Sequence, residues 1–290
     1  MAALAERARA KVNLTLHVLR RRADGWHELD SLVAFAGVAD ALTLAPDDGL
    51  TLSIEGATAA DAGASGDNLV LKAASNLADL VPGLRMGAFH LVKRLPVAAG
   101  MGGGSADAAA ALRLLARANA IAPDDARLHG AARATGADVP VCLASRARVM
   151  RGTGAELGPV IALPPLYGVL VNPGVGVATQ GVFARMGLKP GEENLPAPKG
   201  EIAAKPEFET LLAALKKGRN DMEDAAIVLA PAISAVLAVL GAARGCRLAR
   251  MSGSGATCFA LFQTRQAARR AAQVVRRGHP GWWVAATLLW

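Results

Sequence analysis

The chain has 290 residues, a formal net charge of +8, and a composition that is 52% hydrophobic but only 4% aromatic. This length allows one large domain or two ordinary ones, and the hydrophobic content excludes an intrinsically disordered chain. Three cysteines without a CxxC pair argue against a disulfide framework or a zinc site and indicate a reducing compartment. The positive charge suits a polyanionic small substrate, because no interleaving of aromatic and basic residues points to nucleic acid.

Neither export nor membrane insertion is expected. Residues 1–10 contain Glu6, Arg7 and Arg9 and have no apolar core, which excludes a secretory signal peptide. Residues 225–243 are uncharged and long enough to cross a membrane, but Pro231 interrupts them and much of the stretch is alanine. We expect a cytoplasmic protein in which this stretch forms two core helices with a break at Pro231.

The first half of the chain begins with short strands. Val12, Leu14 and Leu16 alternate with polar residues, which is the period of a strand. Further strands are expected at residues 32–35, 41–44, 50–54 and 86–92, the early ones separated by Gly and Asp turns, with a helix at residues 68–80.

The second half mixes helices and strands. The patterns predict helices at residues 106–118, 125–135, 208–215, 221–241 and 265–277, strands at 146–150, 166–171 and 256–262, and a loop or flexible insertion at 187–206. We place a domain boundary between residues 158 and 159, giving domains 1–158 and 159–290. Strands followed by helices in each half predict two α+β domains with the site in the cleft.

The most informative stretch is the glycine-rich loop from Leu95 to Asp107, which reads Leu-Pro-Val-Ala-Ala-Gly-Met-Gly-Gly-Gly-Ser-Ala-Asp and leads into an alanine-rich helix. Glycine has no Cβ, so its backbone N–H groups can approach a ligand closely. The helix N-terminus adds unsatisfied donors and the positive end of the dipole. The loop predicts a phosphate site, with an unusually glycine-rich turn as the alternative.

The spacing of this loop excludes three known nucleotide-binding loops. A Rossmann fingerprint needs a third glycine where Ser105 stands. A Walker A loop ends in Gly-Lys-Ser/Thr, whereas residues 104–106 are Gly-Ser-Ala. The protein-kinase loop is followed by His-Arg-Asp and Asp-Phe-Gly signatures, which the sequence lacks. A phosphate loop of another kind remains.

Three further motifs each allow a structural and a functional interpretation. Lys11 and Asn13 fall on one face of a strand, where they are either solvent-exposed or presented to a ligand. The Ser-Gly-Ser-Gly run at residues 252–255 precedes an apolar strand and fits a hairpin or bulge. Asp138 can cap a helix that has Pro140 in its first turn.

Taken together, these motifs resemble the GHMP kinases, named after galacto-, homoserine, mevalonate and phosphomevalonate kinases. The resemblance rests on an early Lys-x-Asn, a Pro-x-x-x-Gly-x-Gly-Gly-Gly-Ser loop after a strand, and a late Ser-Gly-Ser-Gly-Ala, in this order. Residues 10–14, 22–29, 136–140 and 220–223 are similar to one branch, which phosphorylates a cytidine diphosphate-linked methylerythritol in the non-mevalonate isoprenoid pathway. The match covers nearly the whole chain.

The resemblance implies a fold and a reaction. The fold is α+β, with a ribosomal-protein-S5-like N-terminal domain, a ferredoxin-like C-terminal domain and the active site in the cleft. The γ-phosphoryl group of ATP is transferred, with Mg²⁺, to the C2 hydroxyl of the substrate, which requires positioning and charge neutralisation. Asp138 matches the aspartate that accepts the hydroxyl proton, and Lys11 matches its lysine partner.

The resemblance also assigns binding residues. The ATP side comprises Pro96, Gly100, Gly102, Gly103, Gly104 and Ser105 around the phosphates, with Asn68 and Lys93 at the adenine pocket. On the other side, Asn13 and Thr179 contact the substrate. Trp26 and Phe183 sandwich the cytosine ring and His27 reads its polar edge, although partial burial by packing is the structural alternative for Trp26. We expect a small-molecule enzyme with no nucleic-acid or membrane partner, as a monomer or weak homodimer.

Some positions depart from the branch. Trp26 replaces the usual Tyr, and Ala98 and Ala99 replace frequent glycines. Ala106 replaces a frequent second Ser, which removes one possible contact to phosphate or Mg²⁺. No acidic residue stands out as a metal ligand, so none is assigned. Two other functions suit the motifs, namely another GHMP kinase of homoserine or mevalonate type, and a catalytically silent nucleotide sensor. Trp26, His27 and Phe183 argue against the first, because those substrates have no base to stack. The presence of both Lys11 and Asp138 argues against the second.

Overall fold

The computed structural model describes residues 3–47, 49–62, 68–198 and 200–290. The chain forms two compact units that interleave along the sequence. The first unit takes residues up to Ala10, Val38–Val97 and Gly102–Ser145, and the second takes Lys11–Gly37, Ala98–Met101 and Arg146–Trp290. Strands β1 (Leu4–Asn13) and β3 (His27–Asp47) therefore contribute to both units.

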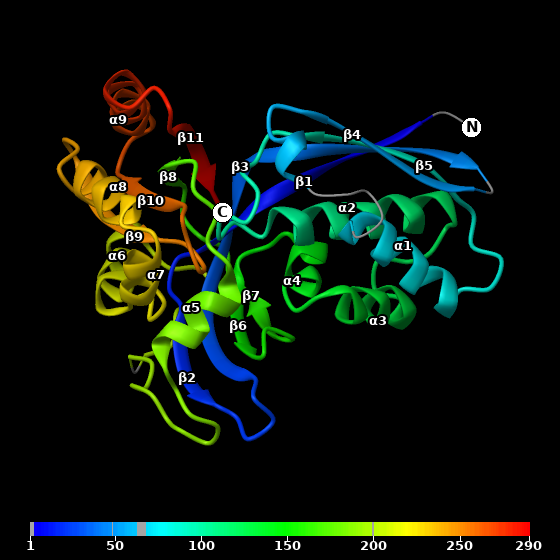
Figure 1. Ribbon diagram of the computed structural model, residues 1–290, viewed down its shortest axis with the longest axis horizontal. Coiled ribbons are helices and arrows are strands. Elements are labelled where there is room, and N and C mark those ends of the chain that lie inside the picture. The colour runs from blue at the N-terminus through cyan, green and yellow to red at the C-terminus, as the bar shows by residue number, and fades with distance from the viewer. Residues whose placement is uncertain (1–2, 48, 63–67, 199) are drawn as a thin grey trace. The chain divides into compact units, whose positions relative to one another are not determined.

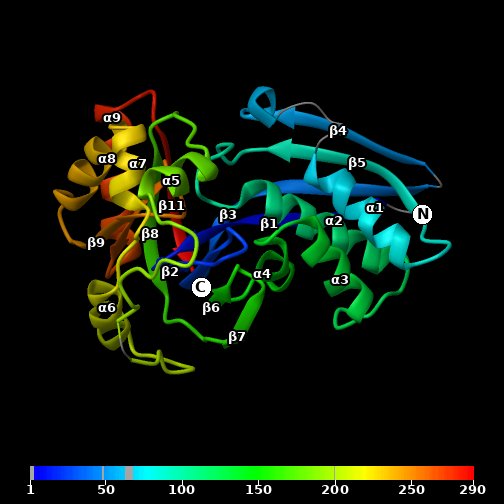
Figure 2. The ribbon, with the colours of Figure 1, turned by 60° about the horizontal axis from the view of Figure 1, so that its bottom comes forward.

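The first unit combines a sheet with a group of packed helices. Besides its parts of β1 and β3, it contains β4 (Leu50–Gly56), η1 (Ala59–Ala62), α1 (Leu69–Leu80), β5 (Met86–Lys93), α2 (Gly103–Ala118), α3 (Ala126–Thr135) and α4 (Val139–Ala144). Strand β4 runs parallel to β5, and β5 pairs antiparallel with β3. Helices α1 to α4 pack together on one side of these strands (Figures 1 and 2).

Local chemistry explains why these helices form where they do. Asn68 caps α1 by accepting from Val70 N at 3.0 Å, and Asp125 caps α3 by accepting from Arg127 N at 2.8 Å. Residues 108–111 of α2 are alanines that are completely buried. Side chains this small let α2 approach its neighbours closely while keeping a strong helix former at every position.

The second unit is built on an antiparallel sheet in the order β11-β8-β10-β9. Its elements are β2 (His17–Arg21), β6 (Arg148–Gly152), β7 (Glu156–Val160), β8 (Leu166–Asn172), α5 (Thr179–Met186), α6 (Phe208–Lys217), α7 (Glu223–Leu229), α8 (Ala232–Gly241), β9 (Cys246–Met251), β10 (Cys258–Phe262), α9 (Arg265–Gly278) and β11 (Trp283–Leu289). The four sheet strands run β8–β9–β10–β11 along the chain, with helices after β8 and after β10. This strand order and these helical crossovers are those of a ferredoxin-like arrangement.

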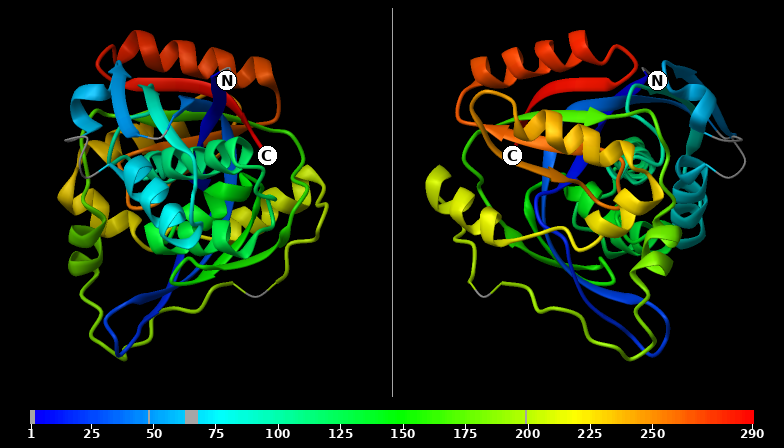
Figure 3. Two further views of the ribbon diagram at one scale, coloured as in Figure 1. Left: turned by 90° about the vertical axis from the view of Figure 1, so that its right-hand side faces the viewer. Right: turned by 60° about the vertical axis from the view of Figure 1, so that its left-hand side comes forward.

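Helices α8 and α9 bury the core of this sheet. Ile233 and Val236 of α8 and Val275 of α9 belong to one buried cluster with the strands. Strand β10 lies between β8 and β9, and all five of its residues are buried. Figure 3 shows α9 lying along β11. Burial of this apolar face supplies the main stabilisation of the unit.

A hairpin of β2 and β3 extends from the second unit and is bordered by the segment that follows α5 (Figure 3). Arg21 N donates to Glu192 O at 2.9 Å, Gly191 N donates to Arg21 O at 2.7 Å, and Asn194 N donates to Leu19 O at 2.8 Å. The expected loop at residues 187–206 contains no helix in its described residues, 187–198 and 200–206, but its first part runs along β2.

Several element predictions are wrong. The strands expected at 32–35 and 41–44 are parts of the single long strand β3, because the intervening Asp40 is satisfied by hydrogen bonds from Lys93, Arg94 and Leu95 and makes no turn. The predictions also lack β2, β7, β9, β11 and α5. By contrast, the break at Pro231 is confirmed, between α7 and α8. Within the described ranges, no helix is both long and apolar enough to span a membrane.

Candidate active site

Three motifs singled out from the sequence meet in the second unit. Lys11 N donates to Met101 O at 2.9 Å, which joins the Lys-x-Asn strand to the glycine-rich loop. Asn13 N donates to Ser252 Oγ at 3.0 Å, and Ser252 Oγ donates to Gly100 O at 2.9 Å. We call these joined segments, residues 11–13, 100–101 and 252–255, the motif junction. Segments far apart in the sequence thus share one hydrogen-bonded centre around Ser252, which is completely buried.

Two glycines allow the backbones in the motif junction to touch. Gly100 has φ +72°, and a Cβ added to it would lie 2.2 Å from Ser252 O. Gly253 has φ +58°, and its Cβ would lie 2.7 Å from Gly100 O. Neither position can hold another residue without movement of the backbone. The Ser-Gly-Ser-Gly run also connects the antiparallel strands β9 and β10, so the hairpin interpretation is confirmed as well.

The glycines at the start of α2 have a different environment. A Cβ on Gly103 would lie 3.6 Å from Lys93 Nζ, and one on Gly104 would lie 3.4 Å from Leu69 Cδ1, which are ordinary contacts. The first bond inside α2 runs from Ala106 N to Gly102 O at 2.8 Å. The N–H groups of residues 103–105 therefore precede the helical ladder and are suited to an anion. The packing of the chain does not itself require glycine at 103 and 104.

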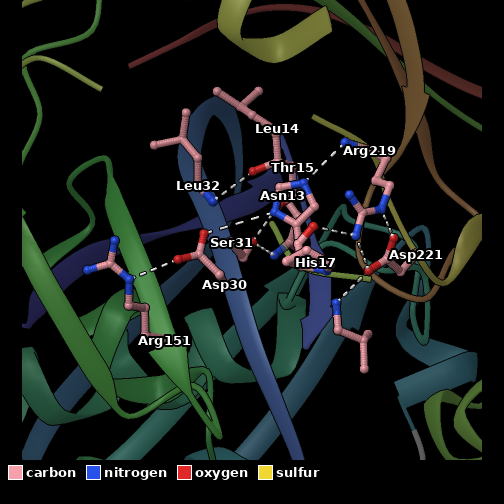
Figure 4. A network of polar contacts seen from close by, with 12 residues as sticks. Asn13, Leu14, Thr15, His17, Asp30, Ser31, Leu32, Arg151, Arg219 and Asp221 are labelled. Carbon is pink, nitrogen blue, oxygen red and sulfur yellow. Dashed lines mark hydrogen bonds and ion pairs between the residues drawn. The ribbon is translucent and has the colours of Figure 1, made fainter. Parts of the chain in front are cut away.

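Lys11 and Asn13 are buried, with exposed fractions of 4% and 1%. The solvent-exposed interpretation of this pair is therefore wrong. Asn13 Nδ2 donates to Ser31 Oγ at 2.7 Å, and Ser31 Oγ donates to Thr15 O at 2.6 Å (Figure 4). In the described part of the chain, no group hydrogen-bonds Asn13 Oδ1. A buried amide oxygen held in place by its own NH₂ group is a site for an incoming donor.

A second part of the same network fixes the turn between β1 and β2 (Figure 4). His17 Nε2 accepts from Arg219 N at 3.3 Å, and Arg219 forms an ion pair with Asp221. Asp221 Oδ2 in turn accepts from Val18 N at 2.8 Å. Burial and the charge of Arg219 lower the pKa of His17, so the imidazole is neutral at pH 7.

Asn220 and Arg250 donate hydrogen bonds to backbone carbonyl groups in and around the motif junction. Asn220 Nδ2 donates to Met251 O at 2.8 Å and to Gly253 O at 2.9 Å, which holds the Ser-Gly loop. The Arg250 guanidinium is buried and donates to the carbonyl oxygens of Leu14, Leu215 and Gly218 at 2.8, 2.9 and 2.6 Å. Burial lowers the pKa of Arg250. These side chains satisfy buried backbone groups that would otherwise destabilise the fold.

The three residues expected to bind cytosine, Trp26, His27 and Phe183, also lie in the second unit. Trp26 is 63% exposed, so partial burial by packing does not explain it. The ring of His27 stacks on Phe183, with centroids 4.0 Å apart and planes 10° apart. Burial and Arg21 lower the pKa of His27, and its buried Nε2 has no hydrogen-bond partner in the described ranges. The structure thus pairs Phe183 with His27 and leaves Trp26 exposed to solvent.

Thr179 and Asp138 lie at helix N-termini. Thr179 is the first residue of α5, and its Oγ1 lies 2.8 Å from Ser254 Oγ, which connects it to the motif junction. Asp138 precedes α4 in the first unit, and Pro140 is in the first turn as expected. The Asp138 side chain makes no capping hydrogen bond to α4, so capping does not account for the carboxylate.

The remaining nucleotide-side residues lie in the first unit. Asn68 caps α1 with its side-chain oxygen, Pro96 follows β5, and Ser105 is in the first turn of α2. Lys93 ends β5 and is buried between two carboxylates, with Nζ 2.5 Å from Asp40 Oδ2 and 2.8 Å from Asp107 Oδ2.

Comparison with known proteins agrees with these motifs. The model of the GHMP kinases N terminal domain matches residues 68–146, and the model called GHMP kinases C terminal matches residues 203–281. A relative from Methylobacterium radiotolerans, named 4-diphosphocytidyl-2-C-methyl-D-erythritol kinase, is 61% identical over 290 residues, with both chains fully covered. The chain belongs to this family of GHMP kinases.

Other proteins named 4-diphosphocytidyl-2-C-methyl-D-erythritol kinase are also similar to this chain over nearly its full length. Relatives of that name from Methylorubrum extorquens and Rhodopseudomonas palustris are 57% and 54% identical, each with at least 98% of both chains covered. A crystal structure of 4-(cytidine 5'-diphospho)-2C-methyl-D-erythritol kinase is 33% identical with a TM-score of 0.74, covering 99% of both chains. A homoserine kinase from Cytophaga hutchinsonii, at 20% identity and a TM-score of 0.69 over 99% of this chain and 95% of its own, shares the fold.

The family confirms the expected fold class and kinase activity. The chain is a GHMP kinase with that superfamily's N- and C-terminal domains, and it uses ATP. The two matched regions lie on either side of the boundary expected between residues 158 and 159, which stays a prediction.

The N–H groups of residues 103–105 at the start of α2 are suited to the phosphates of ATP. For Mg²⁺, no three His, Cys, Asp or Glu side chains are grouped as a metal site among the residues that the structure describes. Mg²⁺ characteristically keeps its waters and is bound with substrate phosphates.

Sequence reasoning did not assign Ser252, Asn220, Asp40 or Asp107 to the site. Ser252 and Asn220 lie inside quoted motifs, but their role depends on contacts more than 25 residues away, at Gly100 and Met251. Asp40 could have been identified from the sequence, because a carboxylate between two apolar segments of one strand needs a buried hydrogen-bonding partner. Asp107 ends the glycine-rich run, which is the only signal for its contact with Lys93.

Proposed function

We propose that this kinase transfers the γ-phosphoryl group of ATP to the C2 hydroxyl of 4-diphosphocytidyl-2-C-methyl-D-erythritol. The observation that carries the proposal is the full-length identity of 61% to a relative of that name. In the reaction the C2 oxygen forms a bond to the γ-phosphorus, the bond from that phosphorus to the β,γ-bridging oxygen breaks, and ADP leaves. The hydroxyl proton is released in this step and goes to a base.

In this proposal Asp138 accepts the proton and Lys11 supplies a positive charge. The carboxylate of Asp138 is not used for capping α4, and it stands at the position that resembles the catalytic aspartate. Lys11 is buried in the motif junction, and it matches the lysine partner of that aspartate in the family. General-base assistance of this kind contributes about 10²–10⁴ in rate.

The ATP phosphates bind the N–H groups at the start of α2. Gly103 and Gly104 contribute backbone N–H groups, and Ser105 adds a hydroxyl in the first turn. Pro96 and Asn68 remain proposed for the nucleotide side, at the entrance of the loop and at the cap of α1. Mg²⁺ bound with ATP would neutralise charge on the phosphates. Binding through backbone donors requires no side chain at these positions, which explains the glycines.

The substrate is bound by several residues of the second unit, two of which have a buried polar atom without a hydrogen-bond partner among the residues that the structure describes. Asn13 Oδ1 is available to accept a substrate hydroxyl, and Thr179 lies beside Ser254 to contact the same ligand. His27 Nε2 is able to accept from the amino group of cytosine, which uracil lacks. Trp26 offers an exposed ring for stacking. For Phe183 to form the second face of a sandwich, its stack with His27 has to open.

A coupled assay of ADP release tests the proposal. The rate of ADP release by the purified protein is measured with 4-diphosphocytidyl-2-C-methyl-D-erythritol, homoserine or mevalonate at equal concentrations, each with ATP and Mg²⁺. We expect turnover with the cytidine substrate alone. Turnover with homoserine or mevalonate instead would support a different GHMP kinase, and ATP binding without turnover would support a nucleotide sensor. Light scattering after size-exclusion chromatography checks the expected monomer or weak homodimer.

A further inference from the structure

Lys93 is a buried ammonium with two carboxylate partners. Its exposed fraction is 3%, and Nζ lies 2.5 Å from Asp40 Oδ2 and 2.8 Å from Asp107 Oδ2. Asp40 is completely buried and Asp107 is 2% exposed. A charge removed from water to this degree needs its partners, because an unpaired buried charge is strongly unfavourable.

This cluster holds both ends of the glycine-rich loop. At the entrance, Asp40 Oδ1 accepts from Arg94 N at 2.5 Å and from Leu95 N at 2.8 Å. At the exit, Asp107 lies in the second turn of α2 and is bonded to Lys93. Residues 95 and 107 are thereby connected through one network of side chains within the first unit. Loop ends fixed in this way lower the entropy that ATP binding has to remove.

The exit end depends on Lys93. Asp107 Oδ1 is buried, and no hydrogen-bond partner for it occurs in the described ranges, so the carboxylate is held through its other oxygen by Lys93. Burial and the nearby Asp40 raise the pKa of Asp107 to about 7, although Lys93 acts in the opposite direction. The cluster therefore tolerates a neutral side chain at 107 more readily than the loss of the acceptor.

Lys93 also lies directly against the loop. Its Nζ is 3.6 Å from the point that a Cβ of Gly103 would occupy. The ammonium is thus next to the backbone of Gly103, and it is bonded to both carboxylates of the cluster. This placement lets the cluster restrain the backbone at the start of α2.

We infer that Lys93 is a positioning residue that acts through Asp40 and Asp107 to fix the phosphate-binding loop, and that it does not itself contact the nucleotide. The inference rests on the proposed function, in which this loop binds ATP. It replaces the adenine-pocket role expected for Lys93 and adds Asp40 and Asp107 to the residues on which ATP binding depends.

Calorimetric titration with ATP and Mg²⁺ tests the inference on the full chain. Asp107→Ala removes the exit contact, and we expect its Kd for ATP to rise at least about tenfold and kcat/KM for ATP to fall about 10²-fold, the size typical of a displaced group. The Kd for CDP should stay within about twofold of wild type. Asp107→Asn keeps an acceptor for Lys93 and should restore ATP affinity to within about threefold of wild type.

Two further variants separate positioning from contact and from lost stability. Leu112→Ala removes a fully buried side chain of the same helix and should lower Tm while leaving the Kd for ATP unchanged. Lys93→Gln, placed in the Asp107→Ala background, should cause no further loss of ATP affinity if Lys93 acts through Asp107. Glutamine can still donate to Asp40, so folding is expected to persist.

The outcomes are distinguishable. Asp107→Ala with the ATP affinity of wild type would overturn the inference and leave the proposed function intact. A further tenfold loss in the double variant would show that Lys93 contacts ATP directly, which also overturns it. Wild-type protein that fails to bind ATP would overturn the proposed function itself.

Discussion

Two glycines of one loop should respond in opposite ways to the same substitution. Gly100→Ala introduces a Cβ 2.2 Å from Ser252 O at a residue with φ +72°. The left-handed conformation costs about 1–2 kcal/mol for an alanine. Movement of the backbone also breaks the hydrogen bond from Ser252 Oγ to Gly100 O, worth about 1 kcal/mol. The free energy of unfolding should therefore fall by about 2–3 kcal/mol, which corresponds to a Tm lower by roughly 5–10 °C.

Gly103→Ala should leave stability unchanged or raise it by up to about 1 kcal/mol, because the position is helical and its Cβ makes ordinary contacts. Its effect should instead appear in ATP binding. The added methyl group lies 3.6 Å from Lys93 Nζ, beside the N–H donors that would bind the phosphates, and we expect the Kd for ATP to rise at least about tenfold, or 1.4 kcal/mol.

The assay pairs urea unfolding with calorimetric titration of ATP for wild type and both variants. Substrate affinity serves as the internal control in Gly103→Ala and should remain that of wild type. The reasoning is refuted if Gly100→Ala is as stable as wild type, since the backbone contact would then be unimportant. It is equally refuted if Gly103→Ala binds ATP normally, which would make the start of α2 an ordinary turn.

Four other outcomes are expected. Asp138→Asn, a nearly isosteric change, should lower kcat by about 10²–10⁴ with little change in the Kd for ATP, and normal turnover in the folded variant would remove Asp138 from the mechanism. Trp26→Ala should raise KM for the cytidine substrate by about 5- to 150-fold, from 1–3 kcal/mol of stacking, while KM for ATP stays constant. His27→Ala should relax the preference for cytosine over uracil, measured with both substrate analogues. Arg250→Met should lower the free energy of unfolding by about 3 kcal/mol in urea titration, because three buried carbonyl groups lose their donor.

Elements with local signals were predictable from the sequence. Asn68 begins α1 as its cap, and the helix expected from residue 265 to 277 is confirmed as α9. Such signals depend on neighbours in the chain, so a single sequence contains them. The strand β3 shows the opposite case, because Asp40 inside it is satisfied by Lys93, which is 53 residues away. Tertiary contacts of this kind override local turn preferences and leave no periodic pattern.

The sequence motifs that make up the site were predictable, but the contacts between them were not. The resemblance placed the glycine loop, Lys11 and Asn13 in one family, yet only the structure shows Ser252 joining them by hydrogen bonds. The exposure of Trp26 and the stack of His27 on Phe183 likewise depend on packing between distant segments. Residue types alone did not show that the fold leaves Asn13 Oδ1 and His27 Nε2 without partners in the described ranges.

The segment that runs along β2 has a consequence for association between molecules. A strand at the edge of a sheet offers backbone donors and acceptors to any other extended chain, which promotes aggregation. Here residues 191–194 bond to Leu19 and Arg21, and Arg21 Nη1 also donates to Leu188 O at 3.0 Å. This segment therefore covers the β2 edge of the hairpin that carries Trp26. A version of the chain shortened here would expose that edge, and self-association would then compete with substrate for the same hairpin.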